Sequence, residues 1–180
     1  TLLNTYSFFA LYANIDGSVK AGALTSGDNA LDRWILSRLQ TLIKEVTSAY
    51  DDYEPTKAAR AIQDFVNDHL SNWYVRLNRK RFWQPTAGDK AMMNDDKLAA
   101  YDTLYECLWV VSQLMSPIAP FFSEWLYKNL TDNLDKKTLG SDSPLQSQSV
   151  HLSYLVKAND ALIDAELEKT MSYAQQICSL

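Results

Sequence analysis

Apolar side chains repeat at helical spacing without a break from Pro55 to Arg81, and this run constrains the fold more than any other feature. Pro55 stands at the first-turn position that proline favours in helices. At about 1.5 Å per residue, the run predicts a rod of roughly 40 Å, the longest element of the chain. Its shared face holds Ala58, Ile62, Phe65, Val66, His69, Trp73 and Leu77.

Similar patterns predict helices on both sides of this rod. One runs from Leu2 to Ala13, and a second from Leu31 to Tyr50 is capped by Asp28 or Asn29. A fourth begins at Asp95 or Asp96 and stops at the prolines of "SPIAP", and "PFFSEWLYKNL" gives a short fifth. The last is opened by Asn159 or Asp160 and runs to Ile177.

The connections complete a single domain over residues 1–180. Segments 16–29 and 131–149 are predicted loops, "SVHLSYLV" a short extended stretch, and 150–180 a C-terminal extension that carries the final helix. Five Gly and five Pro in 180 residues favour helices over a turn-rich β fold. The predicted fold class is all-α, an antiparallel helical bundle of about five to six helices.

Composition and cysteine usage indicate a globular protein in a reducing compartment. Hydrophobic residues make up 47% and charged residues 22%, which excludes a largely disordered chain. Cys107 and Cys178 form no C-x-x-C motif, so neither a disulfide framework nor a zinc site is indicated. The apolar start is too short to span a bilayer and lacks a basic leader, so we expect a soluble, cytoplasmic protein without membrane contact. Because the helical pattern already runs at Leu2, we expect a piece of a longer chain.

The chain lacks every motif that would place catalytic chemistry in it. It has no Glu-x-x-His pair, phosphate-binding glycine loop, G-x-S-x-G elbow or H-E-x-x-H motif. His69 lies on the apolar stripe, where a hydrogen-bonded core histidine is expected, and His151 is assigned a structural or surface role. We predict no catalytic residue, metal or cofactor within this chain.

Charge is segregated along the sequence. Residues 55–83 carry six Lys and Arg against two Asp, a net charge of +4, whereas the remaining residues sum to −9. An acidic body with a concentrated basic strip attracts an anionic partner to one place. Arg76 and Lys80 continue the apolar stripe beyond Trp73, so this end of the helix is expected to project out of the core.

A projecting helix end with arginine and tryptophan offers phosphate contacts and stacking surfaces, the combination that binds single-stranded RNA loops. Arg79 and Arg81 flank the stripe and are predicted to be the freest to meet phosphate. The alternative is that the basic end complements its own helix dipole while the aromatic residues belong to the core. The predicted RNA-binding residues are Arg76, Arg79, Lys80, Arg81 and Trp83, with Lys57, Arg60 and Asn72 earlier on the same helix.

Four segments carry a resemblance to a known family. The string "LDRWILSRLQ" through "LSNWYVRLNRKRFW", Leu31 to Trp83, resembles the anticodon-binding helical domain of class I isoleucyl-tRNA synthetases. "NTYSFFALYANID", "LMSPIAPFFSEWLY" and "SVHLS" are similar to further parts of that domain. "WILSRL" and "SPIAPF" are shared with valyl and leucyl enzymes, whereas "LSNWYVRLNRKRFW" with "SVHL" is distinctly isoleucyl. After "SVHL" the family continues with an acidic residue, an aromatic and a proline, while this chain has Ser153 to Val156.

The resemblance implies a parent enzyme that activates isoleucine with ATP and Mg²⁺ and transfers it to its tRNA. This chain lacks the family's HIGH and KMSKS motifs and would bind the anticodon stem-loop, next to the catalytic domain of the same parent chain. Two alternatives remain open. One is a non-catalytic helical scaffold that docks on another protein, and the other is the equivalent domain of a valyl or leucyl enzyme.

Overall fold

The structure, a computed structural model, describes residues 1–16, 29–83, 95–132 and 147–178. Within these ranges the chain is all-α and contains no strand, as the sequence predicts. Counting the rod formed by α3, η1 and α4 as one, six helical rods are present. The predicted loops at 16–29 and 131–149 lie largely outside the described residues.

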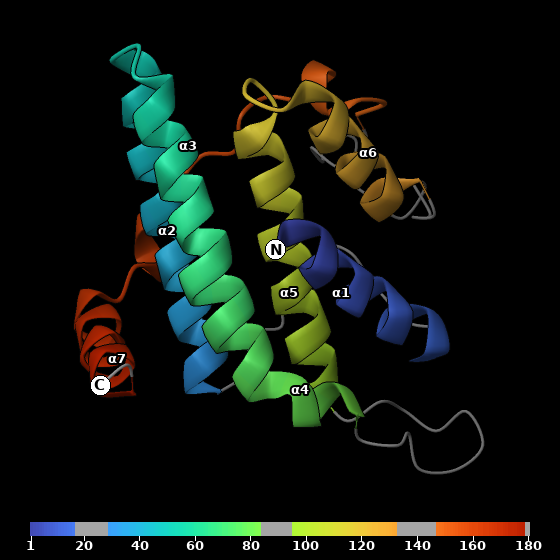
Figure 1. Cartoon of the computed structure of the whole chain (residues 1–180), viewed down its shortest axis with the longest axis vertical. Helices are drawn as coiled ribbons and strands as arrows, with labels where there is room; N and C mark the ends of the chain where they lie inside the picture. Colours follow the sequence, from blue (N-terminus) through green and yellow to red (C-terminus); the bar gives the residue numbers. More distant parts are fainter. Residues whose placement is uncertain (17–28, 84–94, 133–146, 179–180) are drawn as a thin grey trace.

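Three antiparallel rods form the centre of the bundle (Figure 1). The first is α2 (Ala30–Asp51), whose start is capped by the Asn29 side chain accepting from the backbone N–H of Leu31. The second is the long helix, made of α3 (Pro55–Asp64), the π-helix η1 (Phe65–Val75) and α4 (Arg76–Trp83). The third is α5 (Asp95–Met115), which packs against both.

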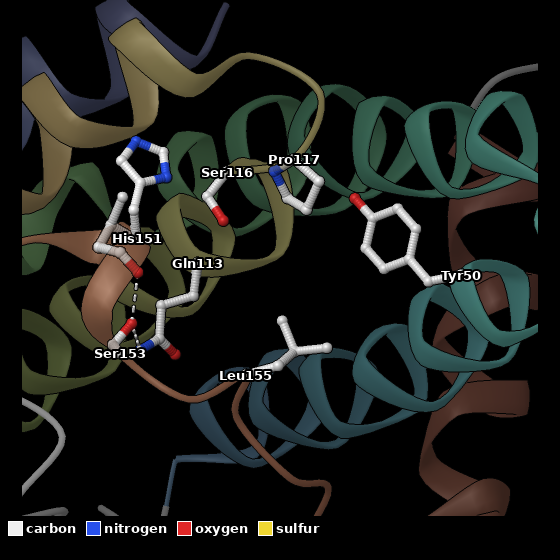
Figure 2. A pocket seen from close by; sticks show the side chains of 8 residues that line it. Tyr50, Gln113, Ser116, Pro117, His151, Ser153 and Leu155 are labelled. Atoms are coloured by element: carbon white, nitrogen blue, oxygen red, sulfur yellow. Dashed lines mark hydrogen bonds between the residues drawn. The ribbon is translucent and has the colours of Figure 1, made fainter.

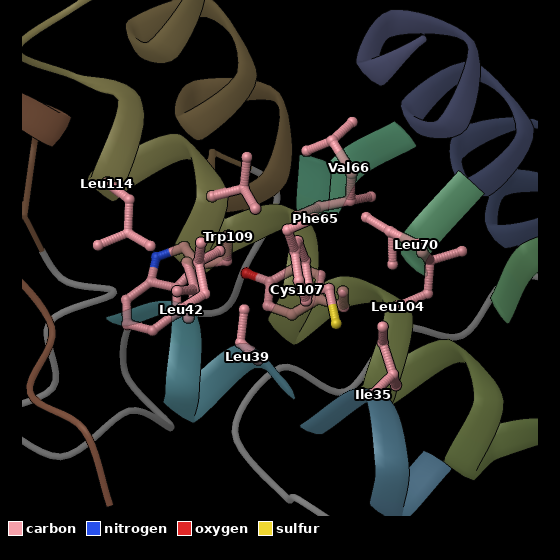
Figure 3. Packing of buried hydrophobic residues seen from close by; sticks show 14 of the residues in the cluster. Ile35, Leu39, Leu42, Phe65, Val66, Leu70, Leu104, Cys107, Trp109 and Leu114 are labelled. Atoms are coloured by element: carbon pink, nitrogen blue, oxygen red, sulfur yellow. The ribbon is translucent and has the colours of Figure 1, made fainter. Parts of the chain in front are cut away.

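The core lies between these three rods (Figure 3). Most of its side chains come from the inner faces of α2, η1 and α5, and many of them are fully buried. Closing this interface removes large aromatic and aliphatic surfaces from water, which is the main favourable term in folding. The fully buried side chains of largest volume include Trp34, Tyr74, Tyr101, Tyr127, Phe65 and Phe82.

Two helices cover one side of this centre. Helix α1 (Leu2–Asp16) lies across α5 and η1, and α6 (Pro120–Thr131) runs back along α5 (Figure 1). Phe8 of α1 contacts Phe82 of α4 edge-on at a ring distance of 5.2 Å, and Phe82 meets Tyr101 of α5 at 5.0 Å. The end of α4 is therefore part of the core and does not project from it.

Helix α7 (Ala165–Cys178) packs on the outer face of α2. Glu168 accepts hydrogen bonds from the hydroxyl groups of Ser37 and Thr41 and pairs with Arg38 at 3.1 Å. Gln175 contacts the ring nitrogen of His69 at 3.4 Å, so the expected hydrogen bond of that histidine is present, but the residue is half-buried and does not belong to the buried core.

The predicted start of the last helix is wrong by about one turn. Asn159 caps only a 3₁₀ turn, η4 (Asp160–Leu162), by accepting from the N–H of Ala161. Ile163 is extended, and the helix restarts at Ala165 with Asp164 accepting from the N–H of Leu167. The apolar periodicity predicts one continuous helix here. The two caps, Asn159 and Asp164, lie five residues apart and divide it into a 3₁₀ turn and an α-helix.

The predicted extended stretch "SVHLSYLV" is also wrong at its start. Val150–Leu152 forms a 3₁₀ turn, η3, because Ser149 caps it by accepting from the N–H of His151. Ser153 itself is extended, but the segment pairs with no strand in the described residues. The segment lies beside α6 and the end of α5.

Candidate nucleic-acid interface

Three of the predicted RNA-binding cations are exposed together on α4. Arg76, Arg79 and Lys80 are on the surface, and none of the ion pairs among the described residues involves them. At 100° per residue they fall, with Trp83, within an arc of about 100° on one side of the helix. The Trp83 side chain is 54% exposed. We call these four residues the α4 face.

Arg81 belongs to the core, and the prediction that it is free to meet phosphate is wrong. Arg81 is only 8% exposed. Both terminal nitrogens bind the carboxylate of Asp32, at 2.7 and 2.8 Å, and further hydrogen bonds reach Asp96 at 2.7 to 2.9 Å. Asp32 is 0% exposed and also accepts from the Tyr74 hydroxyl at 2.7 Å. Arg81 therefore holds α2, α4 and the start of α5 together.

The electrostatics of this network keep its charges in place. Burial alone lowers the pKa of the Arg81 guanidinium, but its hydrogen bonds and its attraction to Asp32 outweigh burial and raise that pKa. For the Tyr74 hydroxyl, burial and the nearby Asp32 charge raise the pKa well above its usual value, so it stays a donor. The paired hydrogen bonds between Arg81 and Asp32 fix the relative orientation of the two side chains, and the Tyr74 hydroxyl binds the same carboxylate.

The π-helix explains why the sequence placed Arg81 wrongly. Each i→i+5 turn holds roughly one residue more than an α turn, so the eleven residues of η1 shift the buried stripe by about two positions. A continuous α-helix would turn Arg76 and Lys80 towards the core after Trp73. In the structure one row of buried positions instead follows four-residue spacing, and Arg81 is buried next to its last member. The row consists of Ile62, Val66, Leu70, Tyr74, Asn78 and Phe82.

Of the remaining predicted residues, Asn72 lies next to the α4 face, whereas Lys57 and Arg60 lie far from it. Asn72 is exposed one turn before Arg76 and extends the face. Lys57 and Arg60 lie about 19 residues earlier, roughly 30 Å away along the rod. There Lys57 pairs with Glu54 at 3.2 Å, and both cations line an open cavity that acidic residues share. The structure thus separates the two groups of cations.

Trp73 packs beneath α7 and does not form part of the exposed face. Its indole N–H donates to the sulfur of Met171 at 3.3 Å, and the side chain is half-buried. The prediction that Trp73 belongs to the core is therefore consistent with its packing.

Asp32 is the residue that sequence reasoning missed. Its place on the buried stripe of α2, between Leu31 and Ile35, is the available signal, since a buried carboxylate requires a buried cation.

Comparison with known proteins assigns the fold to a family. The family model described as "Anticodon-binding domain of tRNA ligase" matches residues 32–180, which include α2 from its third residue onward, the long helix and α7. This chain belongs to that family. The match covers most of the chain, including all four residues of the α4 face.

Curated proteins similar to this anticodon-binding domain include isoleucine-tRNA ligases of several bacteria. The enzyme of Cytophaga hutchinsonii is 54% identical over 182 residues, covering 100% of this chain and 15% of that protein. The enzyme of Bacteroides thetaiotaomicron is 52% identical, over 100% of this chain and 14% of that protein. The enzyme of Dehalococcoides mccartyi is 42% identical, over 99% of this chain and 16% of that protein. The chain thus spans about one seventh of the length of these relatives.

The described part of the chain shows neither a metal-binding cluster nor a membrane-spanning helix. No cluster of three or more His, Cys, Asp or Glu side chains there is arranged to hold a metal ion. None of the described helices combines the length and the apolar character that crossing a membrane needs.

Proposed function

We propose that the α4 face binds the anticodon stem-loop of isoleucine tRNA, and that the chain is the recognition domain of a longer isoleucine-tRNA ligase. The observation that carries this proposal is the exposed group of Arg76, Arg79 and Lys80 beside Trp83, which takes part in none of the ion pairs among the described residues. In that protein, activation of isoleucine with ATP and Mg²⁺ belongs to a catalytic domain outside this chain. We also propose that the protein works in the reducing environment of the cytosol.

Each side chain of the face has a role that follows from its chemistry. The guanidinium groups of Arg76 and Arg79 form paired hydrogen bonds to phosphate oxygens, and Lys80 adds a point charge. The exposed ring of Trp83 stacks on an unpaired base of the loop, an interaction worth about 1–3 kcal/mol per base. Arg81 contributes by fixing α4 on the bundle, so that the exposed residues meet the RNA in one geometry.

Binding of an isoleucine-tRNA anticodon stem-loop across a series of salt concentrations tests the proposal. Lys80→Gln should weaken binding and reduce the slope of log K against log salt by about one unit, since one phosphate contact is lost. Lys169→Gln, which changes an exposed lysine on α7, is the matched control and should leave the slope unchanged. Trp83→Ala should weaken binding without changing the slope.

Two further measurements test the specificity of RNA binding and the alternative function. Stem-loops of valine and leucine tRNA should bind with a similar salt slope but lower affinity if the chain contributes to base recognition. If the chain shows no salt-dependent RNA binding, and instead recovers an acidic protein in a nuclease-resistant complex, the protein-docking scaffold replaces this proposal.

A further inference from the structure

One row of side chains faces solvent along the whole long helix, which runs through the centre of the bundle from α3 to α4 (Figure 1). Each of its residues lies two positions before a member of the buried row that extends from Ile62 to Phe82. Two residues turn an α-helix by about 200°, so the two rows lie on roughly opposite sides of it. All members of this second row are exposed, and we call it the outer row. In chain order it consists of Arg60, Asp64, Asp68, Asn72, Arg76 and Lys80.

The charge of the outer row changes sign along the helix. Arg76 and Lys80 belong to the α4 face, Asn72 is neutral, and Asp68 and Asp64 are acidic. Neither aspartate takes part in any of the ion pairs among the described residues. Eight residues separate Arg76 from Asp68, which amounts to about 10 to 12 Å along the rod. An RNA that extended from the α4 face towards α3 would therefore bring its phosphates over two exposed carboxylates, and like charges repel.

The cations at the far end of the long helix do not compensate for this repulsion. Lys57 pairs with Glu54 at 3.2 Å. Lys57 and Arg60 also line an open cavity together with the acidic side chains of Glu45, Glu54 and Asp64. Three carboxylates against two cations leave a negative charge around that cavity. The described part of the long helix therefore attracts phosphate at its α4 end and repels it further back.

The cationic part of the outer surface is too short for double-stranded RNA. From Arg76 to Trp83 the helix rises by only about 10 Å, whereas domains that recognise duplex RNA by its shape span about 16 base pairs. A duplex carries phosphates along its entire length, so one that lay along the rod from α4 would place some of them over Asp68 and Asp64. A hairpin loop can present its phosphates and unpaired bases to α4 alone, because its chain turns back within a few nucleotides.

We propose that Asp64 and Asp68 are specificity determinants that exclude double-stranded RNA from the long helix and confine binding to a loop at the α4 face. They act by charge repulsion and make no contact with the bound loop. This inference rests on the proposed function of the α4 face and adds which form of RNA that face accepts.

Filter binding to two RNAs with equal numbers of nucleotides tests the proposal. One is the anticodon stem-loop of isoleucine tRNA, and the other is a blunt RNA duplex without a loop. The variant Asp64→Lys/Asp68→Lys converts the outer row into an almost continuous cationic strip. It should add about two phosphate contacts to the duplex, so its gain in duplex affinity should be about tenfold larger at about 50 mM salt than at about 200 mM. The preference for the stem-loop over the duplex should fall accordingly.

A second pair of aspartates provides the matched control. Asp51→Lys/Asp52→Lys makes the same change of charge at exposed positions outside the outer row. Both residues directly follow Tyr50, which lies on the wall of a cavity at the far end of the bundle from α4 (Figure 2). This variant should leave the preference for the stem-loop unchanged. The neutral variant Asp64→Asn/Asp68→Asn removes the repulsion without adding cations, so it should raise duplex affinity by a smaller factor.

The possible outcomes separate this inference from the proposed function. No gain in duplex affinity for Asp64→Lys/Asp68→Lys, or an equal gain for the Asp51→Lys/Asp52→Lys control, would overturn the inference. Binding of the stem-loop by the unsubstituted protein would still support the proposed function in both cases. Failure of the unsubstituted protein to bind the stem-loop would refute the proposed function, and this inference with it.

Discussion

Replacing Arg81 by methionine should destabilise the fold far more than a surface cation would. The change leaves the Asp32 carboxylate at 0% exposure with the Tyr74 hydroxyl as its remaining donor in the network. Removing one partner of a buried ion pair costs about 3–5 kcal/mol, because the other charge stays buried and unpaired. Asp96 is exposed, so its half of the network resembles a surface pair, worth about 0–1 kcal/mol.

Urea unfolding followed by circular dichroism measures these free energies. The expected order of loss is Arg81→Met, then Asp32→Asn, then Asp96→Asn, with unchanged m-values. The double variant Arg81→Met/Asp32→Asn should recover part of the loss, since no unpaired charge remains. If Arg81→Met lowers the free energy of unfolding no more than Asp96→Asn does, Arg81 does not hold the three helices together. The sequence-based prediction that it contacts phosphate would then be reinstated.

Three further predictions concern buried or half-buried groups. Burial raises the pKa of the Cys107 thiol, so a thiol reagent should modify exposed Cys178 at least about 100-fold faster in the native chain. Burial also raises the pKa of Glu106 to about 7, so stability should fall as pH rises from about 4.5 through 7, by about 3 kcal/mol in all. Glu106→Gln should abolish that fall in urea unfolding. Glu168→Ala removes the acceptor of the α2 hydroxyls, so hydrogen exchange should quicken in α7 and stay unchanged in α5.

Local patterns were sufficient to predict the helices and the buried positions of the long helix as far as Val66, whereas Leu77 of the predicted face is 50% exposed. The start of α2 at Asn29, the first-turn proline of α3 and the end of α5 before "SPIAP" are all decided by side chains within a few residues. The exposed positions of Arg76, Arg79 and Lys80 also follow from charge, since an unpaired cation is costly to bury. The caps at Asn159 and Asp164 show the limit of this reasoning, because two good caps close together leave the start of a helix undecided.

The position of Arg81 depended on information that no window of a few residues contains. Periodicity at 3.6 residues per turn assumes an α-helix throughout, and the eleven π-helical residues of η1 displace the stripe by about two positions at its end. The partner that permits Arg81 to be buried, Asp32, lies 49 positions away on another helix. An arginine in a basic segment therefore cannot be assigned to RNA from charge alone. The distinction rests on whether a buried carboxylate elsewhere in the chain requires it, and here Asp32 does.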